Sequence, residues 1–191
     1  MISAPDLAAL LLLVFAALAA YDGVYVHLVA LRLPARPASY AEHLWHTASA
    51  ILFVPVAALL FVEPSSPSNG GAALWTGVAA AIAMYVVEIF DVRAEKASRA
   101  ELGGLARGEL AVHIGALVTR TAALALVVVP LPWSAWGLGG TAAAPASSFA
   151  QTVGLAALGG AIVIAAIHVV LALVHCPVCG PCRGARGGAT G

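Results

Sequence analysis

Five long apolar stretches constrain the fold of this chain more than any other feature. They run over residues 7–31, 40–62, 72–92, 109–129 and 149–174. A helix that crosses the hydrocarbon core of a bilayer needs about 20 mostly apolar residues, and each stretch reaches that length. Only helices or closed barrels satisfy their backbone in lipid, and barrel strands would alternate apolar and polar residues, which these stretches do not. The sequence therefore predicts an all-α integral membrane protein with a bundle of five transmembrane helices.

The composition agrees with this fold class and excludes others. Of the 191 residues, 62% are hydrophobic and 9% are charged, whereas about 25% of the residues of a soluble domain are charged. The formal net charge is zero, which removes any electrostatic reason to expect a nucleic-acid partner. We expect one transmembrane domain over residues 1–175, followed by a Cys- and Gly-rich tail over residues 176–191.

The first stretch also has some features of a cleavable signal peptide. Its n-region, MISAPD, contains no Lys or Arg and carries Asp6, whereas signal peptides begin with a basic segment. We therefore expect this stretch to stay in the protein as its first helix.

The basic residues predict the orientation in the membrane. Eight of the nine lie in three segments on one side of a five-helix chain: Arg32, Arg36, Arg93, Lys96, Arg99, Arg107, Arg183 and Arg186. By the positive-inside rule that side is cytoplasmic, which places the N-terminus outside and the C-terminus in the cytoplasm. Trp75, Trp133 and Trp136 would then form an aromatic belt at the outer boundary. The predicted location is the plasma (inner) membrane, as a multi-pass protein.

All six histidines fall at the predicted cytoplasmic ends of the helices, together with several acids. At a rise of 1.5 Å per residue, His27, His46, Glu88, His113 and His168 lie about 6 to 10 Å inside those ends. Ionisable residues are costly inside a bilayer and are usually functional there. The layer as a whole therefore predicts a site between the helices.

The spacing within this layer indicates a metal centre. Glu42 and His46 are four residues apart, as are Glu109 and His113, and residues three or four apart share one face of a helix. Nitrogen and oxygen donors without thiolate favour iron, zinc or manganese, and carboxylates from several helices favour a two-metal centre. Haem is less favoured, because carboxylates are poor neighbours for its face. The candidate ligands are Glu42, His46, Glu88, Glu109, His113, His27, Asp22, His43 and His168.

Each member of this layer also has a simpler interpretation on its own. Asp91 and His175 fit ordinary interfacial polar residues, since polar groups near helix ends reach the headgroup region. Glu109 fits an acid favoured by the dipole at the start of a helix. His43 could point at lipid headgroups.

A deeper pair of opposite charges is predicted between Asp22 and Arg120. Both lie about 15 to 17 Å from the cytoplasmic end, and two such charges at equal depth most economically pair with each other. The pair would lock the first and fourth helices, unless it serves a proton path, a substrate anchor or, through Asp22, a metal ion. Asp22 and His27 are about 140° apart round a straight helix, so both reach one point only if the helix bends, which Gly23 would permit.

The tail contains a possible second metal site. His175, Cys176, Cys179 and Cys182 form a His-Cys-x-x-Cys-x-x-Cys run after the last apolar stretch. Cytoplasmic thiols stay reduced, so metal binding is more consistent with this spacing than structural disulfides. A tail with accessible thiols and a redox-active Cys pair are the alternatives.

Together these features predict a membrane-embedded metal-binding protein. The first hypothesis is an iron- or zinc-dependent enzyme or redox protein, an oxidoreductase or hydrolase that acts on a lipid-soluble substrate. The alternatives are a metal or proton transporter or accessory protein, and a non-catalytic assembly subunit with a membrane-protein partner. The transporter hypothesis is less favoured, because the outer halves of the helices have almost no polar residues that could form a path across the membrane.

Overall fold

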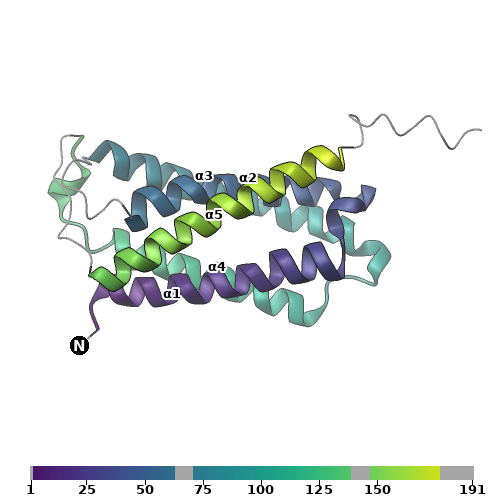
Figure 1. Cartoon of the computed structure of the whole chain (residues 1–191), viewed down its shortest axis with the longest axis horizontal. Coiled ribbons are helices and arrows are strands. Elements are labelled where there is room, and N and C mark those ends of the chain that lie inside the picture. The colour runs from purple at the N-terminus through teal and green to yellow at the C-terminus, as the bar shows by residue number, and fades with distance from the viewer. Residues whose placement is uncertain (1, 63–70, 139–146, 177–191) are drawn as a thin grey trace, which may run out of the picture.

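The computed structural model describes residues 2–62, 71–138 and 147–176, and in these ranges it contains helices and no strand (Figure 1). The long helices are α1 (Ala4–Ala19) continued by the π-helix η1 (Ala20–Ala30), α2 (Tyr40–Val56) continued by the π-helix η4 (Ala57–Val62), α3 (Gly71–Arg99), α4 (Arg107–Val128) and α5 (Ser148–Val174). Short 3-10 turns complete the described chain: η2 (Leu33–Ala35), η3 (Pro37–Ser39), η6 (Ala100–Leu102) and η7 (Trp133–Trp136). Five helical spans are long and apolar enough to cross a membrane, so this part of the prediction is confirmed.

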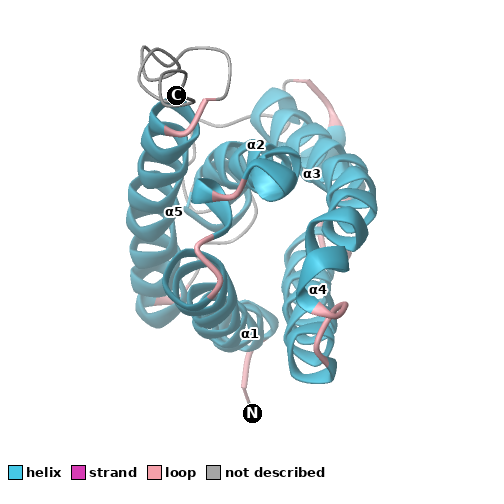
Figure 2. Ribbon diagram, turned by 90° about the vertical axis from the view of Figure 1, so that its right-hand side faces the viewer, coloured by secondary structure: helices cyan, strands magenta, loops and turns pink. Residues whose placement is uncertain are grey.

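The helices form a ring when viewed along the long axis of the molecule (Figure 2). Helix α1 packs on α4 and α5, and α2 packs on α3 and α5. Helices α3 and α4 are joined by polar side chains, among them the hydroxyls of Tyr85 and Thr121, whose oxygens are 2.8 Å apart. The ring order is therefore α1, α5, α2, α3, α4, and it brings residues from every helix to one interior.

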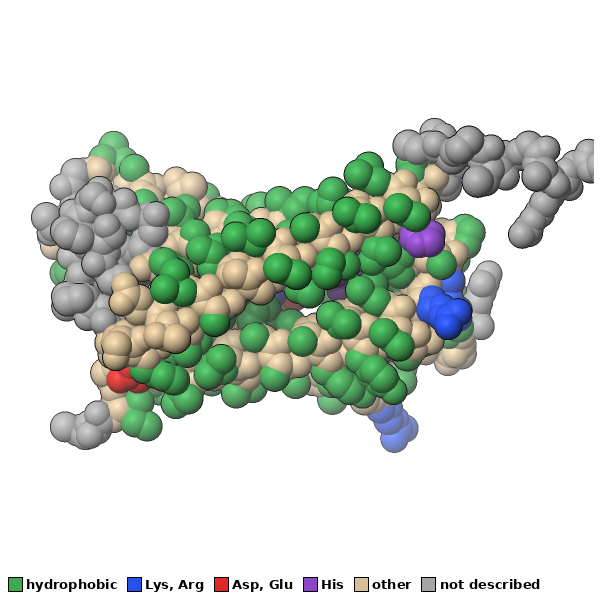
Figure 3. All heavy atoms as spheres, in the orientation of Figure 1, with side chains coloured by type: hydrophobic (Ala, Val, Ile, Leu, Met, Phe, Trp, Pro, Cys, Tyr) green, Lys and Arg blue, Asp and Glu red, His purple; other side chains and the backbone are tan. Residues whose placement is uncertain are grey.

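The surface seen in Figure 3 is mostly hydrophobic, and its Lys and Arg side chains gather at one end of the bundle. Large apolar side chains are exposed along all five helices, including Leu10, Ile51, Ile82, Val118 and Ile162. An apolar exterior of this kind is expected when the surroundings are lipid rather than water.

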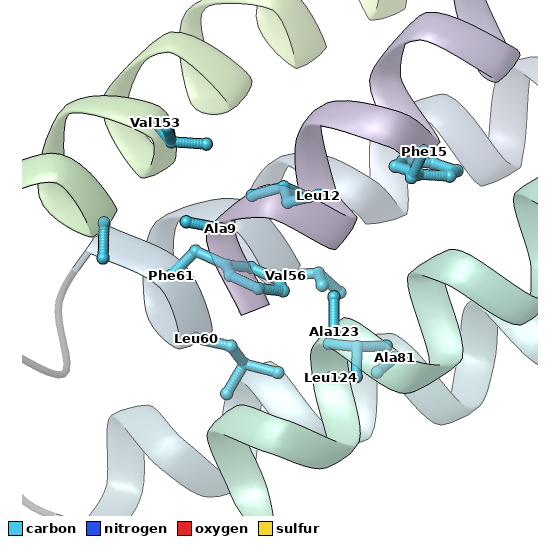
Figure 4. Close-up of a cluster of buried hydrophobic side chains, with 11 residues drawn as sticks. Ala9, Leu12, Phe15, Val56, Leu60, Phe61, Ala81, Ala123, Leu124 and Val153 are labelled. Atoms are coloured by element: carbon cyan, nitrogen blue, oxygen red, sulfur yellow. The ribbon is translucent and has the colours of Figure 1, made fainter. Parts of the chain in front are cut away.

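One half of the bundle interior contains a cluster of buried apolar side chains (Figure 4). The cluster comprises Ala9, Leu12, Phe15, Val56, Leu60, Phe61, Ala81, Ala123, Leu124, Ala150 and Val153. The rings of Phe15 and Phe53 meet edge to face with their centroids 5.2 Å apart. Because lipid is as apolar as these side chains, close van der Waals packing holds this half together.

Two spans change from α- to π-helical geometry within the bundle. In η1 the hydrogen bonds join residues five apart, as in the bond from the Leu31 amide to the Val26 carbonyl at its end, 2.8 Å long. In α2 the change to η4 comes two residues after Pro55, which has no N–H to offer the carbonyl of Ile51. A π-segment changes which residues share a face of the helix, and such segments are frequent at functional sites.

Helix α3 is longer than the sequence predicted. Its apolar stretch ends at Val92, but the helix continues through the polar residues 93–99 and ends in η6 and the left-handed pair Gly103 and Gly104, at φ 84° and 94°. The sequence predicts Arg99 in a linker on the cytoplasmic side, but it lies in the last turn of α3, where it is buried.

The close approach of α5 to η4 gives a test of the packing. A Cβ atom on Gly154 would lie 2.6 Å from the backbone oxygen of Phe61. Overpacking of this kind costs about 1–3 kcal/mol, so we expect Gly154→Val to lower the free energy of unfolding by that amount in detergent-solubilised protein. Gly159→Val is the control, because a Cβ there meets no other described atom within 4 Å. Equal effects of the two substitutions would contradict this packing.

Candidate metal centre

The other half of the bundle interior contains many charged and imidazole side chains, most of them joined in one network. The network draws on four of the five spans: Asp22, His27, Glu42, His46, Glu88, Asp91, Glu95, Arg99, Glu109, His113 and Arg120. A charged group inside a membrane bundle is stable only when it is paired or bound to an ion. The pairings within this network therefore decide what the site can hold.

Arg99 is the central cation of the network and is only 1% exposed. Its Nη1 donates to Glu42 Oε2 over 2.8 Å, and its Nε and Nη2 both donate to Glu109 Oε1, the former over 3.0 Å. Nη2 also lies 3.3 Å from His27 Nε2, and a guanidinium can only donate, so that nitrogen accepts. One side chain thus joins α3 to α2, α4 and η1.

Helix α3 presents one stripe of ionisable residues to the interior. Glu88, Asp91, Glu95 and Arg99 follow one another at intervals of three, four and four residues, which keeps them on one face. Asp91, which the sequence predicts as an ordinary interfacial residue, belongs to this stripe, and so do Glu95 and Arg99, which are not among the predicted site residues. Their signal was this spacing, which becomes visible only if the helix continues past its last apolar residue.

Two histidines share the same arrangement against this stripe. His46 Nδ1 lies 3.3 Å from Asp91 Oδ2, and His113 Nδ1 lies 3.1 Å from Glu95 Oε1. Their Nε2 atoms point the other way, toward Glu42 Oε1 at 3.8 Å and Asp22 Oδ2 at 2.7 Å respectively. A metal-bound histidine usually has a carboxylate on its second ring nitrogen in this way. His46 Nε2 has no hydrogen-bond partner in the described chain, whereas His113 Nε2 is hydrogen-bonded to Asp22, a member of the same candidate ligand set.

The π-helical geometry of η1 brings Asp22 and His27 together. In an α-helix, residues five apart point about 140° away from each other. In η1 the i to i+5 hydrogen bonds return the chain to the same face after five residues, so His27 Nε2 lies 3.6 Å from Asp22 Oδ2. Asp22 and His27 therefore meet through a change from α- to π-helical geometry over the whole of η1, and not through a local bend at Gly23.

Two groups in the described chain have the composition and spacing of a metal site. Asp22, His27, Glu109 and His113 form the first, and His27, Glu42 and His46 form the second. In each group one ligand atom per residue lies within 4.8 Å of all the others. The structure therefore brings six of the nine predicted ligands together, and His27 is common to both groups.

Several buried atoms of these groups have no hydrogen-bond partner among the described residues. They are Asp22 Oδ1, His27 Nδ1, Glu42 Oε1 and His46 Nε2. Unpaired buried polar atoms are costly, and Glu42 and His27 are only 1% and 2% exposed. These four atoms are not bonded to Arg99 and remain available to a cation. The residues present therefore fit a bound metal ion.

Arg120 does not form the predicted pair with Asp22. Its Nη2 donates to Glu88 Oε2 over 2.5 Å, and its guanidinium lies over the ring of Tyr85, 5.0 Å from the centroid. Asp22 instead faces His113, because η1 turns its side chain toward that histidine. Glu88, a predicted ligand, is thereby committed to Arg120 and belongs to neither candidate group.

His43 and His168 form a separate pair on α2 and α5. Their rings stack at 5.1 Å, and His43 Nε2 lies 3.3 Å from the His168 carbonyl oxygen. Both are buried, so His43 faces the interior and not lipid headgroups. Neither belongs to the two candidate groups, although His168 lies 6.5 Å from His46 between ring centroids.

The predicted tail site extends beyond the described chain. His175 caps the end of α5 and Cys176 follows it, whereas Cys179 and Cys182 lie outside the described residues. A metal site in the tail therefore remains a prediction.

Comparisons with known proteins add no assignment. No protein family, curated protein or solved structure matches this chain. What the site does has to be inferred from its own geometry.

Replacement of Arg99 tests whether this cation holds the network together. In Arg99→Met, Glu42 and Glu109 lose their partner inside the bundle, and breaking a buried ion pair costs about 3–5 kcal/mol. We expect a loss of this size in denaturant unfolding of solubilised protein, and a smaller loss in Arg99→Lys, which keeps the charge but not the forked donors. Arg93→Met is the control, because Arg93 is exposed on the same helix. A loss no larger than that of the control would show that Arg99 is dispensable.

Proposed function

We propose that this chain is a membrane-embedded metal-binding protein whose ion is held by the His/carboxylate network. The observation that carries the proposal is the shared arrangement of His46 and His113, each with Nδ1 against a carboxylate of α3 and Nε2 toward the centre. The second ring nitrogen of a metal-bound histidine usually meets a carboxylate or carbonyl in this way, which fixes the tautomer and the orientation of the ring.

The charge of the network supports a bound cation. Six carboxylates share the interior with the two guanidinium groups of Arg99 and Arg120, an excess of four negative charges while the histidines are neutral. Uncompensated charge is costly in a low-dielectric interior, so protons or bound cations must balance it. Two divalent ions supply the whole balance, which agrees with the expectation of a two-metal centre.

The donor set favours iron, zinc or manganese. Imidazole suits iron and zinc, carboxylate suits manganese, and no thiolate lies in either candidate group. Haem fits less well, because five carboxylates that face these histidines, Asp22, Glu42, Asp91, Glu95 and Glu109, would surround its iron.

More specifically, we propose that the bound ion serves an enzymatic or redox reaction. A cavity of about 830 Å³ reaches Asp22, His46, Asp91 and His113 and is otherwise largely apolar. A metal ion beside such a cavity could activate water or oxidise a lipid-soluble substrate, as a hydrolase or an oxidoreductase does. Transport across the membrane is less consistent with the apolar cluster that fills the other half of the bundle.

A non-catalytic assembly subunit is the second candidate function. The observation in its favour is Arg99, whose bonds tie three other helical segments together without any ion. On this view the polar network stabilises the bundle and serves a membrane-protein partner.

For the membrane placement we propose a multi-pass protein of the plasma membrane, with the N-terminus outside. Arg99 no longer supports this orientation, because it is buried in the network, but seven basic residues remain on the predicted cytoplasmic side. At the opposite end Trp75 Nε1 donates to the Trp136 carbonyl over 3.0 Å, as expected of paired belt residues.

Elemental mass spectrometry of detergent-purified protein, prepared without chelator, tests the metal proposal. We expect stoichiometric iron, zinc or manganese in the wild type and its loss in His46→Ala/His113→Ala. His43→Ala/His168→Ala is the matched control, since it removes two buried histidines outside both candidate groups. Asp91→Asn should weaken metal affinity by about 10–100-fold, the usual effect of removing a carboxylate behind a ligating histidine.

The remaining outcomes separate the alternatives. Loss of metal only on truncation before Cys176 would assign the ion to the tail. No metal in the wild type, even after incubation with Fe²⁺, Zn²⁺ and Mn²⁺, would contradict the proposal and favour the assembly subunit.

The orientation can be tested with the native cysteines, all three of which lie at positions 176, 179 and 182. A membrane-impermeant maleimide should label the protein in opened cells and not in intact ones. Labelling of intact cells would reverse the orientation. A variant with all three cysteines changed to serine controls for reaction at other groups.

A further inference from the structure

The interior cavity has the build of a binding site for an organic molecule. Its volume of about 830 Å³ lies within the range of about 300–1,000 Å³ that small-molecule pockets occupy. Apolar residues of α1, α4 and α5 form most of its wall, among them Leu12, Ala16, Leu117, Ala157 and Ile164. Acids and histidines of the network lie at one end, so the cavity is amphipathic along its length.

The cavity opens sideways through the wall of the bundle. Its lining includes Leu13 and Val24 of the first span, Ile114 of α4 and Gly160 of α5, and all four are exposed on the apolar outer surface. Figure 3 shows a hollow on this surface between α1 and α5. In a bilayer such an opening admits molecules from the lipid phase, with no passage through water.

Two acids at the polar end of the cavity have an oxygen that no donor meets. Asp22 and Asp91 line the cavity, and in each the buried Oδ1 has no hydrogen-bond partner in the described chain. Asp22 is only 7% exposed. The two arginines that also line the cavity are bonded to other acids, Arg99 to Glu42 and Glu109, and Arg120 to Glu88, and of their buried nitrogens only Nε of Arg120 is left without a partner among the described residues.

We propose that this cavity binds a single-chain amphiphile whose head group donates hydrogen bonds, an alkyl ammonium or an alkyl alcohol. The chain would lie along the apolar wall between α1 and α5, and the head would meet the free Oδ1 atoms of Asp22 and Asp91. A carboxylate head is excluded by repulsion from the same oxygens. The proposal goes beyond metal binding and does not depend on it, because Asp91 belongs to neither candidate metal group and its free oxygen needs a donor whether or not an ion is present.

The test uses three photoactivatable probes of equal chain length, with an amine, an alcohol or a carboxylate head. Protein in lipid nanodiscs is labelled with each probe, before and after treatment with a chelator, and apparent affinities come from competition with unlabelled probe. We expect the amine and the alcohol to bind and to label peptides of α1 and α5, and the carboxylate to bind at least about tenfold more weakly. Binding by the amine alone would assign the head as a cation, and equal binding by the amine and the alcohol would assign it as a hydrogen-bond donor.

Two neighbouring glycines of α5 give a matched pair of variants. Gly160 lines the cavity and Gly159 does not, and at both a new Cβ meets no described atom within 4 Å. Gly160→Phe should fill the opening and weaken amine or alcohol binding by about tenfold or more, whereas Gly159→Phe should leave it unchanged.

Either of two results would overturn the proposal. One is equal labelling of the two glycine variants, which would show that the probes bind only at the outer surface. The other is a carboxylate probe that binds as tightly as the alcohol. Loss of binding on chelation, with metal present in the untreated protein, would instead show that the head meets the ion and not the free oxygens. If the protein contains no metal and still binds the amine or the alcohol, the metal proposal fails and the amphiphile proposal stands.

Discussion

The ion pairs of Arg99 with Glu42 and Glu109 are the interaction on which the polar half of this bundle depends. A guanidinium keeps its charge in nearly any environment, so it provides a permanent counter-ion where water is excluded. Its forked donors reach two carboxylates and one imidazole at once and so set the distances between α2, α3, α4 and η1. The remaining acids and histidines occupy positions defined by this framework, which makes the precision of the candidate metal centre a consequence of one buried cation.

The bundle interior is thereby divided into two parts with different sources of stability. The apolar half relies on close packing, as where Gly154 lies against the backbone of Phe61. The polar half relies on charge balance and leaves a cavity of about 830 Å³ beside its acids. The cavity also borders the apolar cluster at Leu12, Phe15 and Val153, so the open space lies where the two parts meet.

The sequence predicted the spans well because a length of about 20 apolar residues is a strong and local requirement. It failed at the end of α3, where polar residues continue the helix and carry Arg99 into the interior. Hydropathy cannot detect such a continuation, since it records which residues lipid accepts and not where hydrogen bonding stops. The layer of histidines and acids was also visible in the sequence. Its pairings were not, because the partners of Asp22 and Arg120 depend on how each helix is rotated about its axis.

The geometry of η1 shows most clearly why a pairing can be hidden from a spacing rule. Asp22 and His27 are five residues apart, and rules based on intervals of three or four assume an α-helix. In a π-helix an interval of five is the one that shares a face. Ligand pairs in membrane bundles can therefore lie at intervals that an α-helical search does not inspect.

The position of the network at one end of the bundle has an electrical consequence. Across a membrane the voltage falls mainly over the region of low dielectric constant, which in this protein is the half filled by the apolar cluster. A charge that crosses the whole membrane gains or loses about 2.3 kcal/mol for each ~100 mV. A cation that enters the network from its nearer end does not cross that apolar half. Its occupancy should therefore depend on the membrane potential less than that of a site reached across the whole bundle.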